Sequence, residues 1–190
     1  YKRQPHYFMN HNDGETEAEF LGRIVNNLED LILKEGPETI AAMFAEPLMG
    51  AGGVILPPNG YFEAIQPILS KYDIPLIDDE VICGFGRTGN VWGAETFGMQ
   101  PQSLTVAKAL SSSYLPISAV ILSDEIYTPI AEKSGELGIF GHGYTYGGHP
   151  VSCAVALKTL EIYERDNILA HTNTVSPTFQ QRLNKCLDHK

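Results

Sequence analysis

Short apolar runs that lack polar–apolar alternation recur along this chain, and segments with helical spacing separate them. The runs that we predict as strands cover residues 39–45, 75–81, 104–107 and 117–122. A strand that is apolar on both faces is typical of a parallel sheet, because helices cover both sides of such a sheet. The sequence therefore predicts an α/β fold with a mainly parallel sheet flanked by helices.

Turn and cap residues place helices between these runs. Thr16 and Glu19 have the spacing of a capping box at the start of a helix, and Gly36-Pro37 ends that helix. Residues 1–15 are polar and are expected to form a loop. The other helices that we predict cover residues 61–72, run from Ser123 through Ile130, start at Pro150, and start at Ser176-Pro177.

Composition limits the classes of protein to which the chain can belong. It has 190 residues, 43% of them apolar, which is enough for one domain with a buried core. Thirteen Lys and Arg against 23 Asp and Glu give a net charge of −10, which argues against a nucleic acid or a membrane as partner. No apolar run approaches the roughly 20 residues of a membrane span. The three cysteines form no C-x-x-C pair, which predicts reduced thiols in the cytoplasm and no metal site.

Charged side chains follow three of the predicted strands. Glu46 follows the first strand, Asp79 lies near the end of the second, and Lys108 follows the third. The carboxyl ends of parallel strands meet at one edge of a sheet, and ligands bind beyond this edge. A carboxylate and a lysine at neighbouring strand ends are unusual unless they bind something charged. We therefore predict a ligand site at this edge.

Residues 84–89 match the pattern G-x-G-x-x-G, which is typical of dinucleotide-binding loops. Two features argue against that interpretation. Residues 90–101 are a poor helix, so the sequence predicts no helix N-terminus that binds a pyrophosphate. The acidic residues 78–80 stand directly before the glycines and would repel a phosphate. We therefore assign no nucleotide site to this loop.

The strand around Asp79 suggests a different chemistry. Side chains alternate along a strand, so Asp79 is predicted to share a face with Val81, whereas Asp78 and Glu80 point the other way. A carboxylate followed two residues later by a branched apolar side chain suits a flat, cationic ring such as pyridoxal phosphate (PLP). The alternative is that Asp79 caps a turn or pairs with an exposed arginine, and on these residues alone that alternative is favoured.

Lys108 ends an apolar strand and is therefore expected to be partly desolvated. Desolvation lowers the pKa of an ammonium group and makes the amine a nucleophile. The common alternative is a lysine whose stem lies along the strand while its ammonium group reaches solvent. Together with Asp79, Lys108 suggests a PLP site, but spacing alone leaves both interpretations open.

Three longer stretches are more specific: IDDEVICGFGRTGNVWGAETFG, QSLTVAKALSSSYLPISAVIL and HGYTYGGHPVSCAVAL. From about residue 7 to about residue 172 the chain closely resembles the class III aminotransferases of PLP fold type I. Within that family it looks most like the omega-amino acid or amine:pyruvate transaminases. The resemblance implies that the chain is the central part of a large, PLP-binding domain and that pyridoxal 5'-phosphate is its cofactor.

The resemblance also implies roles for single residues. Asp79 matches the residue that pairs with the pyridine nitrogen, and Val81 matches the residue that packs on one face of the ring. Lys108 matches the lysine that forms a Schiff base with the cofactor and moves the substrate proton. Thr145 matches a threonine that binds the cofactor phosphate of the neighbouring subunit, which implies a homodimer with shared active sites. Glu46 matches a glutamate near the cofactor, with a strand-end cap as the alternative.

Four further residues bear on the substrate side of the implied site. Tyr114 and Tyr144 are candidates for contact with substrate. Ala109 and Ser113 stand where the family commonly has glycine. A positive φ at Ser113 would therefore cost about 1 kcal/mol.

The implied activity moves an amino group from an amine or omega-amino acid to a keto acid such as pyruvate. An aminomutase, a decarboxylating transaminase and a catalytically inactive fragment stay open as alternatives. Family members are roughly twice as long as this chain, so we interpret it as a piece of a longer protein. We predict that residues 1–172 are part of the large domain and that residues 173–190 begin the small domain.

Overall fold

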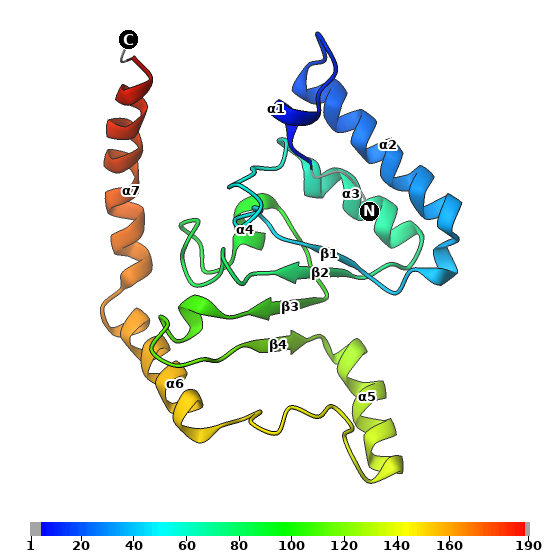
Figure 1. Ribbon diagram of the computed structural model, residues 1–190, viewed down its shortest axis with the longest axis vertical. Helices are drawn as coiled ribbons and strands as arrows, with labels where there is room; N and C mark the ends of the chain where they lie inside the picture. Colours follow the sequence, from blue (N-terminus) through cyan, green and yellow to red (C-terminus); the bar gives the residue numbers. More distant parts are fainter. Residues whose placement is uncertain (1–4, 189–190) are drawn as a thin grey trace.

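Four short strands form one sheet in the computed structural model, which describes residues 5–188 (Figure 1). The strands are β1 (Met43–Ala45), β2 (Leu76–Asp79), β3 (Ser103–Val106) and β4 (Ala119–Leu122), and they lie side by side in this order. β1, β2 and β3 are parallel, whereas β4 is antiparallel to β3. The prediction of an α/β fold with a mainly parallel sheet is therefore confirmed.

The connection from β3 to β4 explains the one antiparallel pair. It covers residues 107–118 and contains only the short 3₁₀ helix η2 (Lys108–Leu110). A parallel return needs a crossover long enough to pass over the sheet, usually a helix, so the chain turns back beside β3 instead. The first strand is shorter than the predicted run 39–45: Thr39 belongs to the 3₁₀ helix η1 (Pro37–Thr39), and the strand begins only at Met43.

Helices occupy most of the remaining chain. The α-helices are α1 (Tyr7–Asn10), α2 (Glu17–Glu35), α3 (Tyr61–Lys71), α4 (Gly93–Phe97), α5 (Asp124–Leu137), α6 (Pro150–Arg165) and α7 (Ile168–Asn184), and the 3₁₀ helix η3 covers Lys185–Asp188. The expected loop 1–15 therefore contains a short helix, and residues 1–4 of that loop lie outside the described residues. Among residues 5–188, no helix is both long enough and apolar enough to cross a membrane.

The predicted capping box starts α2. The Thr16 hydroxyl oxygen accepts the Glu19 N–H at 3.3 Å, and the Glu19 carboxylate accepts the Thr16 N–H at 2.9 Å. Gly36 follows α2 with a φ of 88°, a conformation that favours glycine, so the predicted helix end is also confirmed. α2 and α3 pack on one another, and the main core combines their buried apolar side chains with others from β2, from α4 and from the segments beside them: Leu28, Ile32, Phe62, Ile65, Leu69, Ile74, Leu76, Ala94 and Met99.

Two of the later helices differ from the prediction. α5 runs to Leu137 and not to Ile130, and the Ser123 side chain makes no capping hydrogen bond. The last helix does not start at Ser176-Pro177, because α7 begins at Ile168 and contains Pro177 in its interior. Proline lacks the N–H that continues a helix. The Ser176 hydroxyl donates to the Thr172 carbonyl oxygen at 2.7 Å, one of several such bonds in α7.

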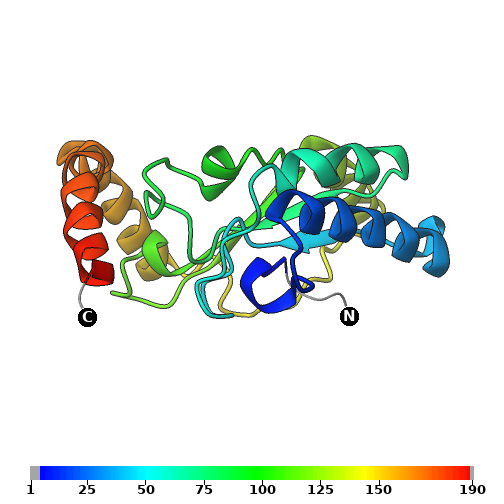
Figure 2. The same cartoon turned by 90° about the horizontal axis from the view of Figure 1, so that it is seen from above.

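The end of the chain lies far from the first helices. Figures 1 and 2 show α6 and α7 at one end of the sheet and α2 and α3 at the other. The predicted boundary between residues 172 and 173 falls inside α7, which runs through it without a break. The division into a large and a small domain therefore stays a prediction.

Candidate active site

The three parallel strands bring the predicted charged residues to the same edge of the sheet. Ala45 of β1 is paired with Asp78, and Asp79 is paired with Thr105 of β3. Glu46 directly follows β1, Asp79 ends β2, and Lys108 stands two residues after β3. The topology thus places the two carboxylates and the lysine beyond the carboxyl ends of three neighbouring strands, where parallel sheets bind ligands.

The carboxylate of Asp79 is held by the turn that follows β2. Its Oδ1 accepts the backbone N–H of Val81 at 3.1 Å, which fixes the orientation of the carboxylate. Asp79 and Val81 are both half-buried, whereas Asp78 and Glu80 are fully buried. This burial confirms the predicted alternation of faces. The hydrogen bond from the Val81 N–H to Asp79 is also a turn-capping contact, of the kind expected under the alternative interpretation of Asp79.

A pair of buried carboxyl groups lies on the other face of this strand end. Glu80 Oε1 accepts the Ala94 N–H at 2.8 Å, in the first turn of α4. Burial, together with the negative charge of Glu80, raises the pKa of Asp78 to about 9. Asp78 is therefore protonated at neutral pH, and the pair belongs to the interior of the fold.

This carboxyl pair also bears on the G-x-G-x-x-G loop. Residues 90–101 were predicted to be a poor helix with no helix N-terminus, and this is wrong in part, because the short helix α4 covers Gly93–Phe97. However, the backbone donors at the start of α4 are already used: Glu80 accepts the Ala94 N–H and Glu95 accepts the Trp92 N–H. A pyrophosphate finds acidic side chains at this position, so the structure gives no support for a dinucleotide site there.

Lys108 differs from the expectation of partial desolvation. It is exposed, and within residues 5–188 its ammonium group makes no hydrogen bond or ion pair. The expected desolvation is wrong for this structure, because the lysine leaves the apolar strand at the first residue of η2 and no described segment covers it. Its amine is therefore free to react with a group that arrives at the sheet edge.

The turn that carries Lys108 has an unusual backbone. Lys108, Ser112 and Ser113 have φ angles of 41°, 47° and 64°. Ser113 thus has the positive φ for which a strain cost was expected from the sequence, and two further residues share it. Non-glycine residues in this region are strained, and such strain is typical of functional sites.

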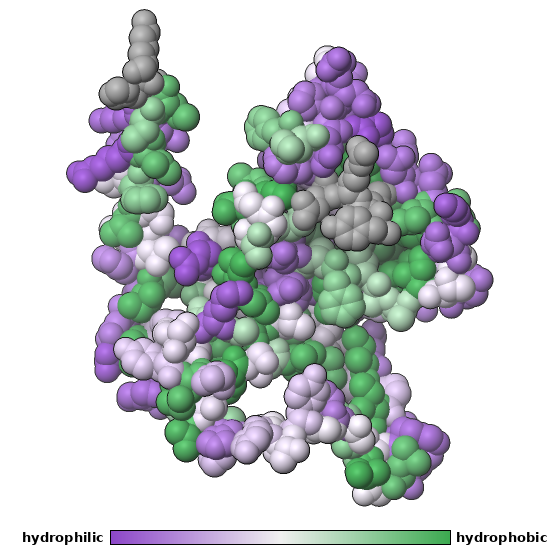
Figure 3. Space-filling model, viewed as in Figure 1, coloured by the Kyte–Doolittle hydropathy of each residue, from purple (hydrophilic) through white to green (hydrophobic). Residues whose placement is uncertain are grey.

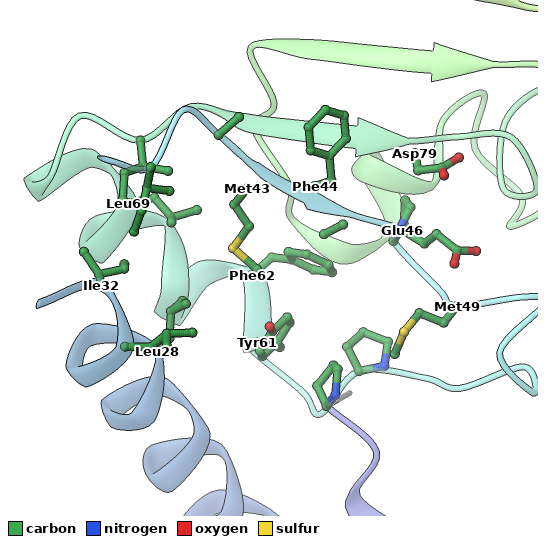
Figure 4. A pocket seen from close by; sticks show the side chains of 18 of the residues that line it. Leu28, Ile32, Met43, Phe44, Glu46, Met49, Tyr61, Phe62, Leu69 and Asp79 are labelled. Carbon is green, nitrogen blue, oxygen red and sulfur yellow. The ribbon is translucent and has the colours of Figure 1, made fainter. Parts of the chain in front are cut away.

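A cavity of about 500 Å³ reaches this edge of the sheet from the core (Figure 4). Glu46 and Asp79 lie at one end of the cavity, and apolar side chains such as Ile32 and Leu69 lie at the other. Glu46 Oε2 accepts the Gly50 N–H at 3.0 Å, which is the strand-end cap that the sequence offered as the alternative. The carboxylates thus form the polar end of an otherwise apolar cavity.

The remaining predicted residues are not brought to this group. Tyr114 and Tyr144 are 80% and 77% exposed, and Thr145 is exposed as well. Thr145 and Tyr144 belong to the loop between α5 and α6, which Figure 1 shows beyond β4, on the side of the sheet away from β1. Within the described part of the chain, this loop therefore contributes nothing to the site at Asp79.

Sequence reasoning missed one residue that contacts the Lys108 turn. Tyr163 of α6 donates a hydrogen bond to the Ala109 carbonyl oxygen at 2.7 Å and contacts the Ser112 hydroxyl at 2.8 Å. Tyr163 and Ala109 are 54 positions apart, and a single tyrosine on a helix has no local pattern that signals such a contact.

The residues at the sheet edge suit PLP. Asp79 Oδ1 accepts the Val81 N–H, and within residues 5–188 its other carboxylate oxygen makes no hydrogen bond, so it can accept the pyridinium N–H. Lys108 supplies an unpaired amine just beyond the end of the neighbouring strand β3. A carboxylate suits the protonated pyridine nitrogen of PLP, and a free amine suits its reactive aldehyde group.

Comparison with known proteins agrees with a PLP site. The family described as Aminotransferase class-III matches residues 3–190. The gamma aminobutyrate transaminase 3, chloroplastic, of Solanum lycopersicum is 60% identical over 179 residues, which are 94% of this chain and 34% of that protein.

Solved structures agree in fold. A structure described as "Transaminase with L-ala" has a TM-score of 0.94 and 50% identity, and the match covers 98% of this chain and 44% of that one. The omega transaminase from Pseudomonas jessenii in complex with PMP has a TM-score of 0.94 and 48% identity, with 98% and 41% covered. The chain thus spans less than half the length of these proteins.

Proposed function

Because the chain belongs to the class III aminotransferases, whose cofactor is PLP, we propose that the whole protein is a transaminase. It moves an amino group from an amine or omega-amino acid to a keto acid such as pyruvate. The superposition over 98% of the chain supports the interpretation that this fold is part of a fold type I transaminase.

One observation carries the proposal: Asp79 and Lys108 stand at the carboxyl ends of two neighbouring, parallel strands. PLP supplies an electron sink when it is bound. In the proposed site the Asp79 carboxylate would accept the pyridinium N–H and keep that nitrogen protonated, while Val81 would pack against the ring. Lys108 would hold the bound cofactor through its amine, and after the substrate amine had displaced it, the freed Lys108 amine would move the proton to and from the substrate Cα.

The names of two matched proteins support the proposed substrates. The tomato relative is named for gamma-aminobutyrate, an omega-amino acid, and one matched structure is described with L-alanine. L-Alanine is what pyruvate becomes when it accepts an amino group. An omega-amino acid donor and pyruvate as acceptor are therefore the first pair to assay.

The exposed loop with Thr145 and Tyr144 supports a shared site. We propose that Thr145 binds the cofactor phosphate of the partner subunit in a homodimer, because its side chain faces solvent and lies away from Asp79. Glu46 lies near the cofactor, and Tyr114 and Tyr144 line the substrate side. The 190-residue chain alone holds only part of such a site, so we expect it to bind PLP weakly and to show no transamination.

The full-length protein provides the test. With PLP bound, borohydride reduction is expected to fix the cofactor on the peptide that contains Lys108. Asp79→Asn is expected to lower the transamination rate by several powers of ten. Asp78→Asn is the matched control and is expected to change the rate far less, because Asp78 points into the interior. Labelling of another lysine, or equal losses in the two variants, would refute the assignment.

The cytoplasmic location stays a prediction. The name of the tomato relative places that protein in the chloroplast. A fluorescent fusion of the full-length protein would distinguish the two compartments.

A further inference from the structure

The turn after β3 holds an energetically unfavourable backbone next to the proposed cofactor-binding lysine. Three non-glycine residues with positive φ occur within six positions: Lys108, Ser112 and Ser113. An L-amino acid adopts this conformation only when its surroundings enforce it. The structure must therefore contain contacts that hold this turn.

Tyr163 makes two such contacts through one hydroxyl group. Its oxygen lies 2.7 Å from the Ala109 carbonyl oxygen and 2.8 Å from Ser112 Oγ. A carbonyl can only accept, so the single phenolic proton is donated to Ala109. Ser112 must then donate its own proton to the Tyr163 oxygen. The result is a directed chain of hydrogen bonds from Ser112 through Tyr163 to Ala109.

The Tyr163 ring is itself held in place. It lies 6.4 Å from the Phe85 ring, centroid to centroid, and Phe85 lies 5.2 Å from the Trp92 ring. Phe85 belongs to the segment after β2, so Tyr163 connects the segment that follows Asp79 with the turn that carries Lys108. The helix behind Tyr163 is fixed as well, because Ala156 of α6 packs in a buried cluster with Val106 and Leu110.

We propose that Tyr163 is a positioning residue for Lys108. Its hydroxyl group holds residues 108–113 in the strained conformation that places Lys108 at the sheet edge, beside the proposed cofactor site. Tyr163 itself touches neither cofactor nor substrate in this proposal. The inference rests on the proposed function, because it needs Lys108 as the residue that binds PLP.

The test uses Tyr163→Phe in the full-length, PLP-loaded protein, since phenylalanine keeps the ring and loses only the hydroxyl group. We expect kcat to fall at least about tenfold, because both hydrogen bonds of the hydroxyl group are lost, while KM for the amine stays unchanged. We also expect the pH titration of the bound-cofactor absorbance to shift, because the lysine is held less firmly. Tyr72→Phe is the matched control, since the Tyr72 hydroxyl donates a hydrogen bond to the Glu29 carboxylate at 2.9 Å, at the contact with α2 and away from the Lys108 turn.

A rescue experiment separates positioning from a general loss of stability. Glycine adopts a positive φ without strain, so Ser113→Gly in the Tyr163→Phe background is expected to restore part of kcat and the wild-type absorbance titration. An unchanged titration in Tyr163→Phe, or no recovery in the double variant, would overturn the inference. If borohydride labels Lys108 in the wild-type protein and Tyr163→Phe behaves like wild type, only this inference fails. If another lysine is labelled, the proposed function fails first.

Discussion

The chain before Lys108 and the chain after Ser113 bury their side chains very differently. Within residues 5–188, the buried apolar side chains lie between Phe20 and Leu110, with Ala156 as the single exception. In the later region, all four residues of β4 are exposed, and α5 and α7 have no buried residue. Figure 3 shows hydrophobic (green) surface over α5 and α7. The large hydrophobic side chains exposed on these two helices include Leu137, Phe179 and Leu183.

This difference separates a region that forms its own core from one that needs other contacts. Exposed apolar faces of this extent mark surfaces that bind protein. The exposed edge strand β4 adds unpaired backbone groups to the same region. The proposed homodimer would cover part of this surface, and the loop with Thr145 belongs to it.

The largest effect that tests this difference is the loss of a core phenylalanine. Phe62 is 2% exposed in the main core, whereas Phe179 of α7 is 67% exposed. Phe62→Ala is expected to lower the free energy of unfolding of the 190-residue chain by about 3–5 kcal/mol. Phe179→Ala is expected to change it by less than about 0.5 kcal/mol. Urea denaturation measures both, and equal losses would contradict the division into two regions.

Asp78 provides a second test, on the pH dependence of stability within the packed region. Its pKa is about 9 in the folded chain and near 3.8 in the unfolded chain, because burial and Glu80 disfavour its charged form. At a pH between these two pKa values, Asp78 keeps a proton in the folded state that it has lost in the unfolded state. The free energy of unfolding is therefore highest at low pH and falls as the pH rises between the two pKa values, by at most about 1.4 kcal/mol per pH unit.

Asp78→Asn removes this titration and keeps the shape of the side chain. We expect the stability of the variant to fall less than that of the wild-type chain between pH 5 and pH 8, as measured by urea denaturation at several pH values. Asp13→Asn is the control, since Asp13 is exposed, and its pH dependence should match the wild-type chain. If the free energy of unfolding of Asp78→Asn depended on pH as steeply as that of the wild-type chain, Asp78 would not be the titrating group.

Sequence patterns predicted the packed region better than the later one. The parallel strands, α2 with its capping box, and α3 follow from hydrophobic spacing and local cap residues, because local contacts and a buried face decide them. The start of α7 was missed, because Pro177 looks like a helix start although the chain was already helical from Ile168. The antiparallel β4 depends on the length of a connection rather than on the strand's own residues.

The candidate site divides in the same way. The position of Asp79, and the opposite face taken by the buried Asp78 and Glu80, follow from the alternation of side chains along one strand. These features could therefore be predicted from the sequence. The exposure of Lys108 does not follow from its apolar strand, because it depends on what covers the sheet edge. The contact of Tyr163 with Ala109 joins residues 54 positions apart, and only the packing of α6 against the turn reveals it.

The prediction with the smallest expected effect compares two helix starts, one in each region, that look alike in sequence. Thr16 precedes α2 and Ser123 precedes α5, and both have a hydroxyl group at the cap position. Thr16 makes the capping hydrogen bond, whereas Ser123 Oγ is buried and has no hydrogen-bond partner within the described residues. The same type of residue therefore has two different energetic roles.

Thr16→Ala is expected to lower the free energy of unfolding by about 1 kcal/mol, because the Glu19 N–H loses its acceptor and the reciprocal box is broken. Ser123→Ala is expected to leave stability unchanged or to raise it slightly, because it removes a buried hydroxyl group that no hydrogen bond compensates. Urea denaturation of the two variants beside the wild-type chain measures the difference. A loss in Ser123→Ala as large as that in Thr16→Ala would mean that Ser123 caps α5 in solution and that the two regions differ less than the structure indicates.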